Sequence, residues 1–182
     1  MSEQPPASST RSSGRVMMII AWIIGIWLAA RFFAQLEERQ VNPNSVPVSE
    51  QLSDGSVEVI LKRNRHGHYV ASGTINGQPV VYLLDTGATD VAIPQALAQR
   101  LALERGAPVQ LATANGVSSG YRTQLQRLTL GDLRLTNVRA TVAPNLTGGE
   151  VLLGMSALKQ LEFTQRGDEL RLRLATSTRE AQ

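Results

Sequence analysis

The chain has 182 residues, and its 18 Lys and Arg residues against 15 Asp and Glu residues give a net charge of +3. Cysteine is absent, which excludes disulfides, thiolate catalysis and zinc–thiolate sites. The arginines are scattered and do not interleave with aromatic residues, so we expect no nucleic-acid partner. His66 and His68 flank a glycine in a predicted turn without a third ligand, so we expect no metal site and no cofactor.

The N-terminal part predicts a membrane anchor. Residues 1–15 are rich in Ser, Pro and Gln and are expected to form a disordered tail. The run from Val16 to Ala30 carries no charge, but its fifteen residues would span only about 22 Å as a helix. Arg31 can extend its charged end to the interface, and apolar residues follow it. The segment 16–34 is therefore long enough for a transmembrane helix.

A cleavable secretory signal has an apolar core of similar length and is the alternative interpretation. A small-x-small cleavage site is missing, because Leu28 lies two residues before Ala30 and Trp27 lies two residues before Ala29. We therefore expect an uncleaved anchor. The polar segment 35–56, which contains two prolines, predicts a flexible linker with a mean reach of about 25 Å.

From residue 57 onward the sequence predicts one mainly β domain over 57–175, followed by a tail over 176–182. Asn76-Gly77 predicts a tight hairpin that leads into the strand before Asp85. Further strands are expected over 57–61 and 69–75, three or four more between 109 and 142, and a closing hairpin over 166–168. Two short helices are expected over 94–103 and 155–161.

Asp85-Thr86-Gly87 is the most informative pattern in the chain, and it follows directly on the apolar run 79–84. In a plain turn the Asp would cap the turn and the Gly would supply a positive φ, and the bare tripeptide fits that interpretation equally well. The context favours a site, because the strand before it is apolar on both faces. A second apolar strand, Val151–Leu153, ends in Gly154 and leads into a helix.

Three segments in this order resemble the retropepsin-like aspartic proteases, specifically the bacterial membrane-anchored, single-domain members. The segments are Leu83-Leu84-Asp85-Thr86-Gly87-Ala88, Ala112-Thr113-Ala114-Asn115-Gly116 and Leu152-Leu153-Gly154. The resemblance covers about residues 57–174. It implies a mainly β, single-lobe acid-protease fold that is closed like a β-barrel and carries two short helices.

The resemblance also implies roles for the matched residues. Asp85 is the catalytic carboxylate, Thr86 hydrogen-bonds across a dimer axis, and Gly87 contacts the substrate backbone. The segment around Asn115-Gly116 is the flap that closes over a bound peptide. Substrate contacts are accordingly expected from Ala88, Thr89, Asp90, Thr113, Ala114, Asn115 and Gly116. Viral relatives carry an acid at the position of Thr89, whereas this chain has one at Asp90, so we expect that contact to differ or to be absent.

The chain contains one such motif, and hydrolysis of this kind takes two carboxylates. Two Asp85 side chains within hydrogen-bond reach cannot both ionise, so the pair holds one proton and titrates in two coupled steps. The charged member can then take a proton from a water while the neutral member donates one to the scissile carbonyl. The sequence therefore predicts an aspartic endopeptidase that cleaves polypeptides as a homodimer.

The positive charges on the two sides of the apolar segment do not decide its orientation in the membrane. Arg11 and Arg15 precede the segment, and Arg31 and Arg39 follow it. Signal-anchor behaviour and the resemblance place the domain in the periplasm, on a single-pass anchor in the bacterial inner membrane. Two alternative functions stay open. One is a peptide-binding module of the same fold that does not cleave, and the other is a scaffold that uses the domain only for docking.

Overall fold

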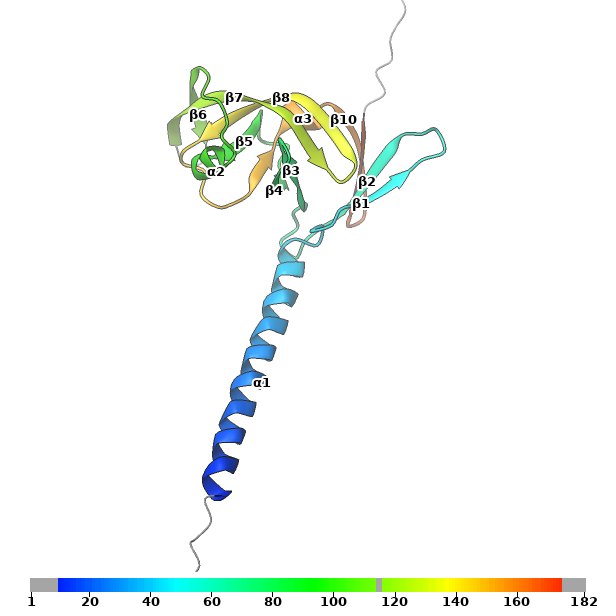
Figure 1. Ribbon diagram of the computed structural model, residues 1–182. Coiled ribbons are helices and arrows are strands. Elements are labelled where there is room, and N and C mark those ends of the chain that lie inside the picture. The colour runs from blue at the N-terminus through cyan, green and yellow to red at the C-terminus, as the bar shows by residue number, and fades with distance from the viewer. Residues whose placement is uncertain (1–9, 114–115, 175–182) are drawn as a thin grey trace, which may run out of the picture. The chain divides into compact units, whose positions relative to one another are not determined.

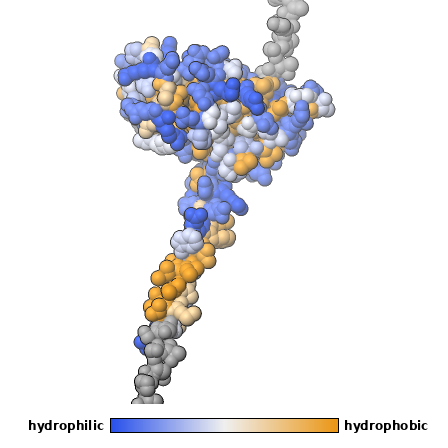
Figure 2. All heavy atoms as spheres, viewed as in Figure 1, coloured by the Kyte–Doolittle hydropathy of each residue, from blue (hydrophilic) through white to orange (hydrophobic). Residues whose placement is uncertain are grey.

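A computed structural model describes residues 10–113 and 116–174. The chain divides into two compact units, Met1–Glu38 and Arg39–Gln182. Helix α1 (Thr10–Val41) begins inside the segment predicted to be a disordered tail, and residues 1–9 lie outside the described part. Its portion Gly14–Val41 is, by length and composition, long and apolar enough to cross a membrane. Figure 2 shows these apolar side chains as a continuous orange band.

The segment predicted to be a flexible linker over 35–56 is largely structured. Helix α1 continues to Val41, and strand β1 (Val48–Gln51) pairs antiparallel with strand β2 (Val57–Lys62). Between α1 and β1, the residue Asn44 is only 3% exposed. Its side-chain amide donates to the carbonyls of Lys62 (2.9 Å) and Val70 (2.7 Å), and its Oδ1 accepts from the Lys62 N–H (2.7 Å). Hydrogen bonds from a polar side chain to the backbone of β2 and β3 therefore hold this segment against the domain. A hydropathy pattern does not reveal such bonds.

The larger sheet has seven strands in the order β3-β4-β9-β5-β8-β7-β6, and β3 also pairs with β7, so the sheet turns back on itself (Figure 1). Strands β4 and β9 pair in parallel, as do β5 and β8, and the other pairings are antiparallel. The strand bounds are β3 (Val70–Ile75), β4 (Gln78–Leu84), β5 (Val91–Pro94), β6 (Pro108–Thr113), β7 (Gly116–Leu130), β8 (Leu133–Ala143) and β9 (Val151–Leu153). The predicted hairpin between β3 and β4 is confirmed, with positive φ values at Asn76 (50°) and Gly77 (83°).

The smaller sheet has four strands in the order β1-β2-β11-β10. Strands β10 (Leu161–Arg166) and β11 (Glu169–Leu174) form the predicted closing hairpin, and β10 is an edge strand. The two expected short helices are present as α2 (Gln95–Arg100) and α3 (Met155–Leu158). Both are shorter than predicted. Pro94 is the last residue of β5, and strand β10 begins three residues after α3.

One apolar core joins the two sheets. Its fully buried side chains include Leu61, Tyr82, Ile93, Leu125, Leu153 and Leu172. At Gly73, where β3 meets β7, a β-carbon would collide with the Thr129 carbonyl oxygen and the Tyr82 ring, so only glycine fits there. The predicted fold class, mainly β with two short helices after an apolar N-terminal helix, is confirmed.

The Asn44 contacts predict a stability effect. Replacing Asn44 with Ala leaves the Lys62 N–H and the Val70 carbonyl without their side-chain partner. We expect Asn44→Ala to lower the free energy of unfolding by about 2 kcal/mol, measured by urea denaturation of the full chain in detergent micelles with circular dichroism. Asn145→Ala, at an exposed loop position, is the control and should change it by less than about 0.5 kcal/mol. Equal stability of the two variants would contradict the assignment of residues 42–51 to the folded domain.

Candidate active site

The loop that carries Asp85 leaves the end of β4 and is held by its own backbone and by β9. The Asp85 N–H donates to the Leu153 carbonyl (3.2 Å), and the Gly87 N–H donates to Asp85 Oδ1 (2.9 Å). The Ala88 N–H donates to the Asp85 carbonyl (3.2 Å). One carboxylate oxygen of Asp85 is therefore bound inside the loop, which orients the side chain.

The conformation of Gly87 differs from what the plain-turn interpretation requires. Gly87 is not among the described glycines with a positive φ. A β-carbon at this position would instead lie 3.1 Å from Asp85 Oδ1. The absence of a side chain at Gly87 therefore leaves room for the Asp85 carboxylate.

The N-terminal end of α3 also holds the Asp85 loop in place, through hydrogen bonds to the loop backbone. The Met155 N–H donates to the Ala88 carbonyl (2.8 Å), and the Ser156 N–H donates to the Thr89 carbonyl (3.0 Å). A β-carbon at Gly154 would lie 2.7 Å from the Ala88 carbonyl oxygen and would collide with the Asp90 carbonyl oxygen. The pairing of the Asp-Thr-Gly motif with the second glycine motif, noticed in the sequence, is thus a direct backbone contact.

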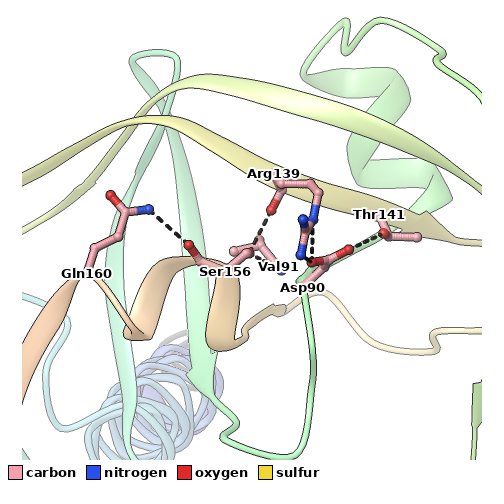
Figure 3. Close-up of polar contacts among 6 residues, drawn as sticks. All are labelled: Asp90, Val91, Arg139, Thr141, Ser156 and Gln160. Atoms are coloured by element: carbon pink, nitrogen blue, oxygen red, sulfur yellow. Dashed lines mark hydrogen bonds and ion pairs between the residues drawn. The ribbon is translucent and has the colours of Figure 1, made fainter.

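Asp90 closes the loop through an ion pair, as Figure 3 shows. Arg139 on β8 donates from Nε (2.8 Å) and Nη2 (2.7 Å) to Asp90 Oδ1, and the Thr141 hydroxyl donates to Oδ2 (3.3 Å). The hydrogen bonds with Asp90, and then its charge, raise the pKa of the Arg139 guanidinium above its ordinary value. Both carboxylate oxygens of Asp90 are therefore occupied within the chain.

Ser156 connects the same strand to the end of the loop. Its hydroxyl donates to the Arg139 carbonyl (2.7 Å) and accepts from the Val91 N–H (2.9 Å). The Ser156 carbonyl in turn accepts from the Gln160 amide (2.9 Å; Figure 3). Sequence reasoning missed Arg139, Thr141 and Ser156. Only the position of Ser156, two residues after Gly154, could have drawn attention to it.

A cavity of about 390 Å³ opens beside Asp85 and the exposed Thr86. Its other lining residues are mainly apolar: Tyr69, Leu84, Leu158, Phe163, Gln165, Leu170 and Leu172. Asp85 is the only carboxylate among these residues of the described chain. One acid beside an apolar hollow is half of the two-carboxylate arrangement that the sequence predicts.

The remaining candidate residues lie in the Asp85 loop and in the β6–β7 hairpin. Gly87 and Thr89 are exposed, and Ala88 is half-buried. Thr113 and Gly116 are paired at the end of the β6–β7 hairpin. Ala114 and Asn115 lie outside the described residues. Among the described residues, no group of three His, Asp or Glu side chains could hold a metal ion.

The sequence model of the family described as "gag-polyprotein putative aspartyl protease" matches residues 71–160, which include the Asp85 loop, the hairpin and Gly154. The crystal structure of a retropepsin-like aspartic protease from Rickettsia conorii matches with a TM-score of 0.56 and 28% identity, over 70% of this chain and 95% of that one. The chain belongs to a retropepsin-like family of aspartic proteases. Its fold is retropepsin-like, as predicted.

Two further proteins resemble this retropepsin-like chain. The "Uncharacterized protein in cobV 5'region" of Sinorhizobium sp is 37% identical over 125 residues, which is 66% of this chain. The match covers 54% of that protein, so the chain spans about half the length of this curated relative. The EIAV protease in complex with the inhibitor HBY-793 matches with a TM-score of 0.44 and 24% identity, over 54% of this chain and 92% of that one.

The contact at Gly154 gives a test of how the retropepsin-like loop is supported. Gly154 has a φ of −86°, which any residue can adopt, so an added methyl group acts only through the space it needs. We expect Gly154→Ala to force the Asp85 loop away from α3 and to lower the free energy of unfolding by about 2 to 3 kcal/mol, measured by urea denaturation. Gly149→Ala is the matched control, since nothing lies within 4 Å of its added carbon. A Gly154→Ala protein as stable as the control would refute the bracing contact.

Proposed function

We propose that this protein is a membrane-anchored aspartic endopeptidase whose active form is a homodimer with two Asp85 carboxylates at its centre. The observation that carries the proposal is the Asp85 loop itself. The loop orients one carboxylate through the Gly87 N–H and presents it to a cavity that holds no second acid among the described residues. A second copy of the chain supplies the missing carboxylate under two-fold symmetry.

In the proposed mechanism the two Asp85 side chains share one proton. The ionised carboxylate takes a proton from a water molecule, whose oxygen attacks the carbonyl carbon of the scissile peptide bond. The protonated carboxyl donates its proton to the carbonyl oxygen, and a tetrahedral diol forms. A proton then passes from the first carboxyl to the amide nitrogen, the C–N bond breaks, and the diol returns its proton to the second carboxylate as it becomes the carboxylic acid product.

The surface beside Asp85 supports pairing of two copies. Phe163 lies on the edge strand β10, is 50% exposed and lines the same cavity as Asp85 and Thr86. An edge strand has unpaired backbone groups, and a large exposed aromatic beside it favours association. In the proposed dimer the partner covers Phe163 and the cavity, while Thr86 lies at the axis beneath the two carboxylates.

Helix α1 supports the membrane part of the proposal. Its apolar side chains, such as Trp22 (68% exposed) and Ile26 (65% exposed), have no protein partner to cover them in the described structure. A helix with such a surface is stable in a bilayer, because its backbone groups are paired internally. The domain is proposed to lie in the periplasm, on a single-pass anchor in a bacterial inner membrane.

A mixing experiment tests the dimer mechanism. Full-length chain and its Asp85→Asn variant are combined at constant total protein in detergent micelles, allowed to exchange subunits, and assayed with a peptide library. If activity needs two Asp85 side chains, an equal mixture retains about a quarter of the wild-type rate, because only pairs of wild-type chains are active. A monomeric enzyme would retain half. No cleavage by the wild type at high concentration would instead favour the non-catalytic peptide-binding module.

A second variant distinguishes loss of dimerisation from loss of the Asp85 carboxylate. Phe163→Asp adds a charge to the surface that the proposed partner covers, so it should raise the dimer dissociation constant at least about tenfold in sedimentation and lower activity in proportion. Thr164→Asp on the same edge strand is the control for added charge. If Phe163→Asp left both the dissociation constant and the rate unchanged, the proposed interface would be wrong.

Orientation in the membrane can be measured directly. In spheroplasts of a Gram-negative host that expresses the full chain, external protease should digest the domain and leave a fragment of about the size of α1, while a cytoplasmic marker stays intact. Alkaline carbonate should not extract the chain, because α1 is long enough to cross the bilayer. Protection of the domain in intact spheroplasts, with digestion only after lysis, would place it in the cytoplasm and overturn this part of the proposal.

A further inference from the structure

A second hollow, of about 430 Å³, shares only Arg139 with the site described above. Its lining residues are Glu104, Arg105, Gly106, Arg122, Thr123, Gln124 and Arg139. Three of these side chains are positively charged and one is negatively charged. We call this hollow the arginine groove.

The arginine groove is built by close backbone contacts. The Gly106 N–H donates to the Arg122 carbonyl (2.8 Å), and the Arg122 N–H donates to the Ala107 carbonyl (2.8 Å). A β-carbon at Gly106 would lie 2.7 Å from the Arg122 carbonyl oxygen, so glycine allows this approach. The segment after α2 is thereby held against β7, and it brings Arg105 next to Arg122.

Two of the three arginines contact another side chain. The Arg105 guanidinium lies over the Tyr121 ring, 4.9 Å from its centre, which restrains the side chain. Arg139 is paired with Asp90. Within the described part of the chain, neither Arg105 nor Arg122 has an ion pair with a carboxylate. Two guanidinium groups, that of Arg105 restrained by the Tyr121 ring and that of Arg122, are thus available for an anionic ligand.

The groove is connected to the Asp85 loop through Asp90. Asp90 is five residues after Asp85, so their Cα atoms are at most about 18 Å apart. Arg139, a lining residue of the groove, contacts Asp90 directly at 2.7 Å. About six residues of an extended peptide would cover the distance from Asp85 to Asp90, and about two more would reach past Arg139 to Arg122 on the neighbouring strand. A polypeptide whose scissile bond lies at Asp85 can therefore reach the groove with residues several positions away.

We propose that the arginine groove binds acidic side chains of the polypeptide substrate, several residues from the scissile bond, and so selects substrates with an acidic segment. This inference rests on the proposed function. Carboxylates of Asp or Glu fit because Arg105 and Arg122 present planar donors that bind them in pairs. Arg139 contributes positive charge at the edge of the groove while it keeps its bond to Asp90.

The test measures binding rather than cleavage, so it gives a result even if the chain is not a protease. Full-length Asp85→Asn protein in non-ionic micelles is titrated with two fluorescent peptides. Each has the same apolar core, followed about six residues later by Glu-Asp-Glu in one and Gln-Asn-Gln in the other. We expect the acidic peptide to bind about tenfold more tightly at low salt, and the difference to shrink at high salt.

Two double variants test whether the preference for the acidic peptide depends on the arginine groove. Arg105→Ser with Arg122→Ser should remove the preference for the acidic peptide. Arg134→Ser with Arg166→Ser removes the same charge from exposed positions outside the groove and should retain the preference. Equal loss in both double variants would show attraction by net charge alone and overturn the proposal. Stronger competition by short-chain phosphatidylserine than by free acidic peptide would assign the groove to lipid headgroups and overturn it as well.

Discussion

The site depends on one steric constraint, which is the close packing of the loop after Asp85 against the backbone at the start of α3. The carbonyls of Ala88, Thr89 and Asp90 lie against Gly154 and the first N–H groups of α3, with no side chain between them. A loop held by backbone hydrogen bonds on both sides loses little further conformational entropy when a substrate binds. The position of the carboxylate is therefore determined by the parallel pairing of β4 with β9, which places the two motifs side by side.

The contribution of the Asp90–Arg139 ion pair to stability is limited by its exposure to solvent. Arg139 is more than half exposed, and an exposed ion pair contributes only about 0 to 1 kcal/mol. The main effect of the pair is therefore to position the end of the loop rather than to stabilise the fold. Together with the Ser156 hydroxyl, which bridges Val91 and Arg139, the pair holds the end of the Asp85 loop against β8 at the point where β5 begins. The same guanidinium lies at the edge of the arginine groove, so one side chain belongs to both the loop support and the proposed substrate surface.

Local patterns predicted the elements of the domain, because alternation, turn residues and prolines act over a few neighbours. Asn76-Gly77 and the order of the glycine motifs are examples. Asn44, Arg139 and Phe163 could not be predicted in this way. The role of Asn44 depends on backbone groups of Lys62 and Val70, and that of Arg139 depends on a carboxylate far away in sequence. Phe163 is identified only once β10 is known to be an edge strand beside Asp85. The linker prediction differed from the structure for the same reason, since residues 42–51 belong to the folded domain.

The energetics of pairing explain why an anchor suits a chain with one carboxylate. Burying the half-exposed Phe163 of both copies contributes about 1.5 to 3 kcal/mol in total, whereas a dimer with a micromolar dissociation constant needs about 8 kcal/mol. The exposed apolar surface beside Asp85 is therefore too small to pair dilute copies in solution by itself. Confinement of anchored copies to a membrane raises their effective concentration without any new contact. In the proposed enzyme, weak pairing of the domains is enough once α1 holds two chains in the same bilayer, and activity then depends on the surface density of the chain.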